Sequence, residues 1–415
     1  LNLDGKGIFQ ATFVAGEFLA KCDVLVPSLS PGKWDLFEVK GTNSRKDGEN
    51  EDRDHISDLA FQTAVLERCG ISLNRLGIVH LDKAYVRDGE LDTTALFVVD
   101  TVTDLVRERL PKIEAQMAEA AAFLNRADEP ADGCACHYHG RSRQCTTFSY
   151  SHPEIPAYSV HDIVRIGQSK KKLKLLVDDR VYALNDVPDD IELSEPQRNQ
   201  VMVHQRQTPI VVPASIKAEL ETYTFPLYFF DYETYAPAIP AFDGYSPYQR
   251  IPFQFSLHVV RSAEAAPEHI DYLHEAATDP TDFVGELLAQ HIDPRGTVLV
   301  WSLPFERGVN SEIGKRRTQH ATAMTRINGQ LKDLQDIFKN QWYVDHGFKG
   351  KTSIKNVLPV LCPELSYKSL EIQEGATASN KWWEMVAPTT SPADKQRIDE
   401  ALRQYCGLDT YAMYA

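Results

Sequence analysis

The 415-residue sequence contains no apolar run of the roughly 18 residues that a membrane-spanning helix needs. Its first ten residues, LNLDGKGIFQ, lack the regions of a signal peptide. Cysteine is also scarce, because seven residues at irregular spacing are too few for a secreted disulfide scaffold in a chain of this length. We therefore expect a cytoplasmic protein with no membrane partner.

Basic charge is in deficit as well. The chain has 44 Lys and Arg against 59 Asp and Glu, a formal net charge of −15. This balance argues against a protein that coats nucleic acid electrostatically. It does not exclude a nuclease, because metal-binding carboxylates contribute to the negative charge. We interpret Lys170, Lys171 and Lys172 as candidate nucleic-acid contacts, and the alternative for such a run is a solvated helix face.

No internal repeat is visible, and the chain is too long for one ordinary core, so we expect two fused domains rather than a duplication. Hydrophobic content of 43% and charged content of 25% are typical of a soluble globular protein. The sequence opens on Leu1 and stops within a predicted helix, so we expect a piece of a longer chain.

Residues 1–130 combine short alternating runs with helical periodicity, which predicts a compact α/β domain. An antiparallel meander is expected over residues 8–40. A polar loop over 41–54 leads to a helix that ends at Gly70. Later segments are expected to form two strands and a long helix, interrupted near Pro111: residues 75–86, 95–102 and 104–127.

Acidic and basic residues in the meander suggest metal chemistry. Glu38 and Lys40 lie at i and i+2 of one strand and therefore share a face, and Asp23 lies on the preceding strand. Two carboxylates can hold Mg²⁺ or Mn²⁺, and a neighbouring lysine can orient water or neutralise charge on a phosphate. Asp58 and Gln62 follow one turn apart on the next helix.

The order Asp23, Glu38-x-Lys40 and a helix bearing Gln62 resembles the PD-(D/E)XK nuclease superfamily, in particular its RecB-like branch. The resemblance implies that Asp23 and Glu38 bind metal, that Lys40 is catalytic and that Gln62 belongs to a downstream helical motif. The aromatic residue usual after that glutamine has no evident counterpart in TAVLER. The alternative is an exposed ion pair at a strand end.

A second set of acids lies in residues 222–415, the predicted second large domain. Asp231 and Glu233 share a face at the end of an apolar strand, where they would repel unless a cation lay between them. Glu306 follows another predicted strand, and Tyr405 and Asp409 lie one turn apart on the last helix. Acids that hold two metal ions can support attack of water on a phosphodiester.

This set resembles the DEDD exonuclease group of the ribonuclease H-like fold, in the variant that ends in Tyr-x-x-x-Asp. The opening Asp-x-Glu is matched by Asp231 and Glu233, and the last motif by Tyr405, which would orient water, and Asp409. The second motif is similar to His-Asn-x-x-Phe-Asp, where this chain reads WSLPFE.

Two departures from that motif are Ser302 for Asn and Glu306 for Asp, whose extra methylene would shift a metal. Longer stretches, among them GKTSIKNVLPVLCPEL and YCGLDTYAM, resemble a bacterial domain-of-unknown-function family in which this domain follows a RecB-like nuclease. Lys355 is a candidate phosphate contact. Asp333 and Asp336 are further candidate acids, with an ordinary helix face as the favoured alternative.

Three thiols crowd together in residues 131–157: Cys134, Cys136 and Cys145, with His137, His139 and His152 nearby. Thiolates suit an iron–sulfur cluster, whereas thiolates with histidine also suit zinc. Some RecB-like nucleases, including CRISPR-associated ones, resemble this arrangement and hold a [4Fe–4S] cluster with a fourth, upstream cysteine. Cys22 is the sole upstream candidate before Asp23, and it lies inside a strand. A [4Fe–4S] cluster, zinc and no metal all stay open.

We therefore expect an α/β protein with a restriction-endonuclease-like domain followed by a ribonuclease H-like mixed-sheet domain. The Cys-rich segment and a small helical module, residues 158–221, would join them. The expected function is a Mg²⁺- or Mn²⁺-dependent nuclease acting on DNA in repair or defence. The alternatives are an RNA-processing nuclease, or a nucleic-acid-binding protein whose C-terminal domain guides substrate without cutting it.

Overall fold

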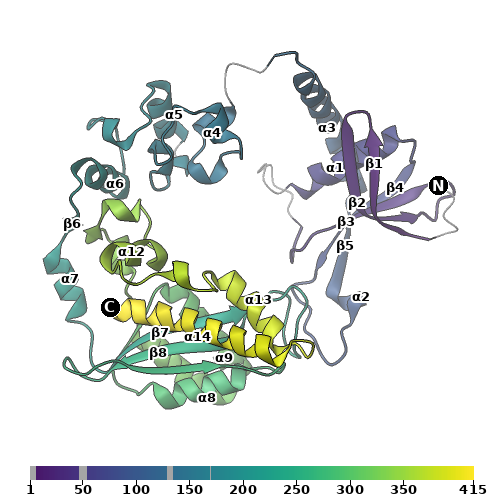
Figure 1. The fold of residues 1–415 in the computed structure, drawn as a ribbon. Coiled ribbons are helices and arrows are strands. Elements are labelled where there is room, and N and C mark those ends of the chain that lie inside the picture. The colour runs from purple at the N-terminus through teal and green to yellow at the C-terminus, as the bar shows by residue number, and fades with distance from the viewer. Residues whose placement is uncertain (1–5, 46–53, 129–133, 169) are drawn as a thin grey trace. The chain divides into compact units, whose positions relative to one another are not determined.

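The computed structural model describes most of the chain, namely residues 6–45, 54–128, 134–168 and 170–415, with the backbone alone for Lys170. Two compact units make up the chain (Figure 1). The first comprises residues 1–129 with 236–249, and the second comprises 130–235 with 250–415. In the described ranges, no helix combines the length and the apolar character needed to cross a membrane.

The first unit is built on a five-stranded sheet. Its strands, in spatial order, are β1 (Ile8–Ala15), β2 (Phe18–Pro27), β3 (Trp34–Val39), β4 (Leu73–Leu81) and β5 (Phe97–Thr101). The first three form the antiparallel meander that the alternating runs predict. β4 is parallel to β3 and antiparallel to β5. A parallel pair needs a crossover, which helix α1 (His55–Arg68) provides.

Helix α1 begins where the sequence predicts it. The Asp54 carboxylate accepts hydrogen bonds from the backbone N–H groups of Ile56 and Ser57, both at 3.1 Å, and so caps the helix. Its apolar face, including the fully buried Leu59 and Leu66, lies in the core of this unit. The remaining described helices of the unit are α2 (Thr93–Leu96) and α3 (Thr103–Leu124).

Helix α3 differs from expectation, because it continues through Pro111 without interruption. Proline removes a single N–H bond to the carbonyl four residues earlier. Buried Val106, Ile113 and Met117 anchor the helix to the core on both sides of the proline. Packing therefore outweighs the local defect.

Residues 236–249 pack with the first unit, although we expected them within the domain that starts at residue 222. The backbone N–H of Arg87 donates to the Tyr245 carbonyl at 3.0 Å, and the Tyr248 hydroxyl donates to the Gly41 carbonyl. The segment lies between two parts of the second unit in sequence, but these hydrogen bonds join it to the first unit, and no local periodicity signals them.

The second unit contains another five-stranded sheet, in the order β11-β10-β7-β8-β9. The strands are β7 (Leu227–Tyr235), β8 (Ile251–Val260), β9 (Glu268–Leu273), β10 (Thr297–Val300) and β11 (Leu331–Asp333). β7, β8 and β9 form an antiparallel meander, and β10 is parallel to both β7 and β11. The sequence predicts β7, β8 and β10, but three-residue β11 is too short to show a period, so Asp333 lies on a strand rather than on a helix.

Helices cover both faces of this sheet, so that every residue of β8 is buried. The described helices here are α8 (Thr281–His291), α9 (Leu303–Arg316), α10 (Ala321–Gln330), α11 (Asp336–Lys339), α12 (Ile354–Leu361), α13 (Gly375–Val386) and α14 (Pro392–Tyr414). Tyr228 and Phe230 of β7 pack in a cluster with α8, α9 and α10. Phe229, on the opposite face, packs with Met413 of α14, which crosses the sheet in Figure 1. Asp231 has the parity of Phe229 and therefore faces α14.

A small helical module precedes this sheet in sequence. Its described helices are α4 (Phe148–Ser151), α5 (Lys170–Asp178), α6 (Glu195–Arg206) and α7 (Pro213–Leu220), and β6 (Ile210–Val211) pairs with β12 (Tyr343–Val344). Ser194 is the N-cap residue of α6, and its backbone N–H donates to the Gln197 side chain at 3.1 Å in a capping box. Val160, Leu173 and Val201 are fully buried in the module's own core.

Trp382 of α13 is a central packing residue of the second unit. It is fully buried, stacks on Phe253 of β8 with ring centroids 4.7 Å apart, and donates its N–H to the His274 carbonyl at 2.7 Å. We predict that Trp382→Ala lowers the free energy of unfolding by about 3–5 kcal/mol, measured by urea denaturation. The neighbouring Trp383 is 38% exposed, so Trp383→Ala should cost about 1 kcal/mol. Equal losses would contradict this packing account.

Candidate functional site

Three carboxylates meet on the α14 side of the second sheet. Asp231 and Glu233 lie on β7 and Asp409 lies on α14, and one oxygen of each is within 4.8 Å of the others. The i, i+2 spacing on the strand brings the first two to one face, as predicted. Glu233 and Asp409 are 7% and 8% exposed, and Asp231 is partly buried. A buried set of like charges therefore lies where a strand and a helix cross.

Burial raises the pKa of all three groups, and repulsion from neighbouring carboxylates adds to this effect at Asp231 and Glu233. Burial, then Asp409, raises the pKa of Glu233 to about 8, although Lys355 opposes the shift. Burial raises the pKa of Asp409 to about 6, although a hydrogen bond from Tyr367 and the charge of Lys355 lower it. The pKa of Asp231 is well above its ordinary value, through burial first and then Asp409 and Glu233. The positive charge of Lys355 is not enough to let all three ionise near neutral pH.

Oxygen donors in this arrangement suit a hard divalent cation. Oxygens that bind one Mg²⁺ at about 2.1 Å stand about 3 to 4 Å apart. The three carboxylate oxygens already lie within 4.8 Å of one another, so small side-chain movements would let them bind one ion. Asp231, Glu233 and Asp409 therefore fit a Mg²⁺ or Mn²⁺ site.

Tyr405, Tyr367 and Lys355 surround this cluster. The Lys355 ammonium donates to the Tyr405 hydroxyl at 3.1 Å, and the Tyr367 hydroxyl donates to Asp409 Oδ1 at 2.6 Å. Lys355 was predicted to contact phosphate and here lies beside the acids, which is compatible with that role. Tyr367 was not predicted, because it lies 42 residues from Asp409 and outside any motif.

A buried polar chain fixes α14 against the sheet and so positions Asp409. Ser256 Oγ and His258 Nδ1 of β8 lie 2.7 Å and 2.8 Å from the Thr410 hydroxyl, which is next to Asp409. The Gln254 side chain donates to the Leu402 carbonyl at 3.0 Å. These bonds bring together residues about 150 positions apart, which explains why the sequence alone did not identify them.

Glu306 is placed differently from the other three acids. It lies in the first turn of α9, is 1% exposed and has one carboxylate oxygen without a hydrogen-bond partner among the described residues. Burial raises its pKa to about 8. It is near enough to raise the pKa of Asp231, yet it is not part of the group that shares the 4.8 Å limit.

Asp333 has a structural role that accounts for its charge. Its carboxylate accepts from the backbone N–H groups of Ser302 and Leu303 at 3.2 Å and pairs with Lys339 at 3.0 Å. Ser302, the residue that stands where the motif has Asn, has a positive φ of 106° at the start of α9. The strand-to-helix turn is thus held by Asp333, not by the Ser302 side chain.

In the first unit, four of the predicted residues meet. The Lys40 ammonium donates to Glu38 Oε1 at 2.7 Å and to the Asp58 carboxylate, and the Gln62 amide donates to Glu38 Oε2 at 2.7 Å. Burial raises the pKa of Glu38, against the effect of Lys40 and Gln62. Burial would lower the pKa of Lys40, but Asp58 and Glu38 outweigh it and raise that pKa. This cluster, unlike the one on β7, contains its own cation.

Asp23 lies apart from this arrangement. Its carboxylate accepts from the Val39 backbone N–H at 2.8 Å and from the Gln10 side chain at 2.6 Å. Among the described residues, Asp23 and Glu38 do not form a three-ligand group with another acid. Their joint role in binding metal stays a prediction.

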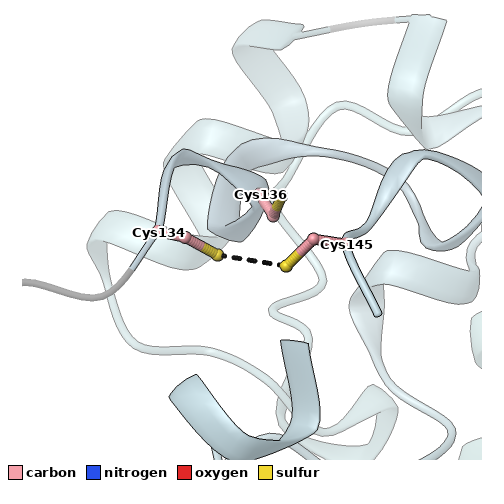
Figure 2. Close-up of side chains that lie close together, drawn as sticks. All are labelled: Cys134, Cys136 and Cys145. Atoms are coloured by element: carbon pink, nitrogen blue, oxygen red, sulfur yellow. Dashed lines mark hydrogen bonds between the residues drawn. The ribbon is translucent and has the colours of Figure 1, made fainter. Parts of the chain in front are cut away.

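The three predicted thiols do come together. Cys134, Cys136 and Cys145 have their sulfurs within 4.8 Å of one another, and Figure 2 shows Cys134 and Cys145 pointing toward each other at 3.7 Å. Cys22 is fully buried in the core of the first unit, where burial and then Glu38 raise the pKa of its thiol to about 12. Cys406 is likewise buried, as expected for a core residue, whereas Cys69 and Cys362 are partly exposed.

A basic cleft of about 1160 Å³ lies in the second unit. Its cationic lining residues are Arg141, Arg143, Arg165, Lys171, Lys349 and Lys351. Asp162 also lines it but pairs with Arg141 at 2.8 Å. Lys171 of the predicted lysine run is exposed here, Lys172 is partly buried, and the side chain of Lys170 lies outside the described residues.

Two of these lysines, Lys349 and Lys351, lie at a tight turn. Lys349 and Gly350 have positive φ of 51° and 73°, and a side chain at Gly350 would meet Gln200 of α6 at 2.4 Å. Glycine is therefore required for the close approach of the turn to α6. Lys351 follows the turn, and Lys355 of the acidic cluster follows four residues later.

Residues 228–353 match a protein family described as Domain of unknown function (DUF2779). The match includes Asp231, Glu233 and Glu306 and ends two residues before Lys355. No curated protein shows significant similarity to the chain, and no solved structure does either.

The raised pKa values predict how stability depends on pH without metal. Glu233, with a pKa of about 8 when folded, holds its proton more tightly than an ordinary glutamate. Its contribution is complete below about pH 4.5 and is lost as the pH rises through about 8. With EDTA, the free energy of unfolding should therefore fall from pH 6 to about 8.5, by at most about 1.4 kcal/mol per pH unit for each proton.

Urea denaturation at a series of pH values measures this slope. Mn²⁺ should raise stability at the alkaline end, because a bound cation compensates the ionised carboxylates. Glu233→Gln should flatten the slope without abolishing it, since Glu306 also has a pKa of about 8. A slope that neither Mn²⁺ nor Glu233→Gln changes would show that the carboxylate cluster is not its source.

Proposed function

We propose that the chain is a metal-dependent nuclease that hydrolyses phosphodiester bonds of DNA. The observation that carries the proposal is the meeting of Asp231, Glu233 and Asp409 beside Tyr405. A buried set of acids costs stability unless a cation compensates it, so its presence indicates a site for divalent metal. Metal held by carboxylates activates water and stabilises charge on a phosphate when it is bound.

The second unit supports assignment of residues 222–415 to the ribonuclease H-like fold and the DEDD exonuclease group. Three antiparallel strands followed by two strands parallel to the first are compatible with that fold. In the proposed role Tyr405 orients the attacking water, and Lys355 holds its hydroxyl at 3.1 Å. Glu306, if it serves as the fourth acid, needs a change of side-chain position to join the other three.

The first unit supports a RecB-like PD-(D/E)XK domain over residues 1–130. A mixed sheet brings Glu38 and Lys40 to a helix that supplies Gln62, in the order that the motif predicts. Lys40 would transfer a proton or neutralise the phosphate, and Glu38 would bind metal with Asp23. In the described structure Lys40 and Gln62 contact the two oxygens of the Glu38 carboxylate, and metal would have to share it.

We propose the basic cleft as the binding surface, because it gathers positive charge locally in a protein of net charge −15. Six cationic side chains line it, and the segment from Lys349 to Lys355 leads from the cleft to the acidic cluster. We propose that a single strand follows this segment, with its phosphates on the lysines. Phosphate contacts do not distinguish sugars, so RNA is the alternative substrate.

A second reading has support in one observation. Glu306 is separate from the other three acids, so the set of metal ligands would be incomplete. In this alternative the C-terminal domain binds the strand and guides it without cutting. The two readings differ in whether the second unit trims DNA ends.

Cleavage of two labelled DNA substrates with Mn²⁺ tests both assignments. Lys40→Ala should lower cutting of a circular single strand, which has no ends, by about 100-fold or more. Asp231→Asn should lower trimming of an end-labelled linear strand by about 100-fold or more. Exposed Lys33→Ala and Glu400→Gln are matched controls and should act like the parent.

If both site variants cut like the parent, the site assignments are wrong. Absence of trimming by the parent, with weaker strand binding by Asp231→Asn, would favour the guiding role. Cleavage of the matching RNA alone would replace DNA as the substrate.

Binding of a labelled single strand tests the cleft. Lys349→Ala with Lys351→Ala should weaken binding and reduce the slope of log affinity against log salt by about 1.4, that is about 0.7 for each phosphate contact. Lys217→Ala, whose side chain is 76% exposed, is the control in the same unit. Fluorescence anisotropy at several salt concentrations gives both quantities. An unchanged slope in the double variant would exclude the cleft as the path of the strand.

A further inference from the structure

A histidine nitrogen lies beside the cluster formed by Cys134, Cys136 and Cys145 and could serve as a fourth metal ligand. Cys134 lies at the start of the short helical turn η1 (Ala135–Tyr138), Cys136 lies within it, and Cys145 follows η2 (Arg141–Arg143). His152, directly after α4, places its Nε2 atom 3.8 Å from Cys134 Sγ. The described segment from 134 to 152 thus supplies four donors without a residue from elsewhere in the chain.

Two measured distances between these donors match a single zinc ion. The three sulfurs lie within 4.8 Å of one another, and His152 lies within the same limit of His137 and Glu154. Around a tetrahedral zinc, with Zn–S of about 2.3 Å and Zn–N of about 2.0–2.1 Å, two sulfurs stand about 3.8 Å apart and a sulfur and a nitrogen about 3.6 Å apart. The Cys134 and Cys145 sulfurs are 3.7 Å apart, and Cys134 and His152 are 3.8 Å apart. In a [4Fe–4S] cluster each ligand binds a different iron, so the ligand atoms stand further apart.

A second observation concerns the other nitrogen of His152. Its Nδ1 atom lies 3.6 Å from Glu154 Oε1, and the His152 side chain is buried, while the His137 ring stacks on it with centroids 4.3 Å apart. Histidines that bind metal commonly donate their other N–H to a carboxylate, which fixes the ring and its tautomer. His152 is therefore oriented by Glu154 and His137 with its Nε2 toward the Cys134 thiol.

We propose that Cys134, Cys136, Cys145 and His152 form a closed, structural zinc site with Glu154 as the outer partner of the histidine. Four protein ligands leave no position for water or substrate, which is the arrangement of structural rather than catalytic zinc. The site needs no upstream cysteine, and Cys22 is buried in the core of the first unit.

The ion would also shape the basic cleft. Gly140, Arg141 and Arg143 line the cleft and lie in sequence between Cys136 and Cys145. Zinc would close the loop that carries them and reduce its freedom in the folded state. This consequence holds whatever the cleft binds.

Metal content of the full chain tests the proposal directly. After dialysis against Mg²⁺, which fills oxygen sites, we expect one zinc per chain and no absorbance near 400 nm. X-ray absorption should give three sulfur neighbours at about 2.3 Å and one nitrogen at about 2.0–2.1 Å. Iron with acid-labile sulfide, a shell of four sulfurs, or a metal-free protein would each overturn the proposal.

Variants then test the fourth ligand by competition with a zinc chelator. His152→Ala should weaken zinc binding by more than about 100-fold, and Glu154→Gln, at a half-exposed side chain that is not needed for packing, by about 10-fold. His139→Ala, in the same segment but outside the cluster, should bind like the parent. If His152→Ala does not fold, unchanged affinity in Glu154→Gln rejects the proposed orientation of His152. Loss of zinc from His137→Ala but not from His152→Ala would also reject it.

Discussion

Repulsion among buried carboxylates is the constraint on which the second unit depends. Glu233 and Asp409 are almost completely buried and share a small space with Asp231, so each raises the free energy of ionising its neighbours. The surrounding structure nevertheless holds them together. The fully buried strand β8 supports β7, and the Thr410 contacts with Ser256 and His258 fix α14. Lys355 and the Tyr367 hydroxyl compensate part of the charge, and a divalent cation would compensate the rest.

The first unit solves a similar problem with its own side chains. Lys40 lies between Glu38 and Asp58, and Gln62 satisfies the second oxygen of Glu38. This cluster is balanced without metal, so its geometry is compatible with catalysis but does not require a cation. The cluster on β7 is the stronger indication of metal binding, whereas the sequence favoured catalysis at Glu38 and Lys40.

The sequence predicted those parts of the fold that have a local period. Alternation identified β1 to β3, apolar runs identified β7 and β8, and helical spacing of apolar residues identified α1. The i, i+2 and i, i+4 rules placed Asp231 with Glu233 and Asp409 with Tyr405 on common faces. What failed was short or non-local: β11 has three residues, and Pro111 was given more weight than the packing around it.

The same limit applies to the site. Tyr367 and Glu154, which pairs with His152, belong to no motif, because their roles arise from contacts in the folded chain. Residues 236–249 return to the first unit through the Arg87 backbone, a pairing of more than 150 positions in sequence. For Glu306 the motif predicted a contact that the fold does not make. The motif placed Glu306 with the other acids, but its position in the first turn of α9 leaves it outside their cluster.

The most direct test of the account is anomalous diffraction from crystals of the full chain grown or soaked with Mn²⁺. The account predicts a manganese peak coordinated by carboxylate oxygens of Asp231, Glu233 and Asp409, and its loss in Asp231→Asn. Crystals that bind Mn²⁺ elsewhere, or not at all, with the three carboxylates unchanged, would contradict the claim that this cluster is a metal site.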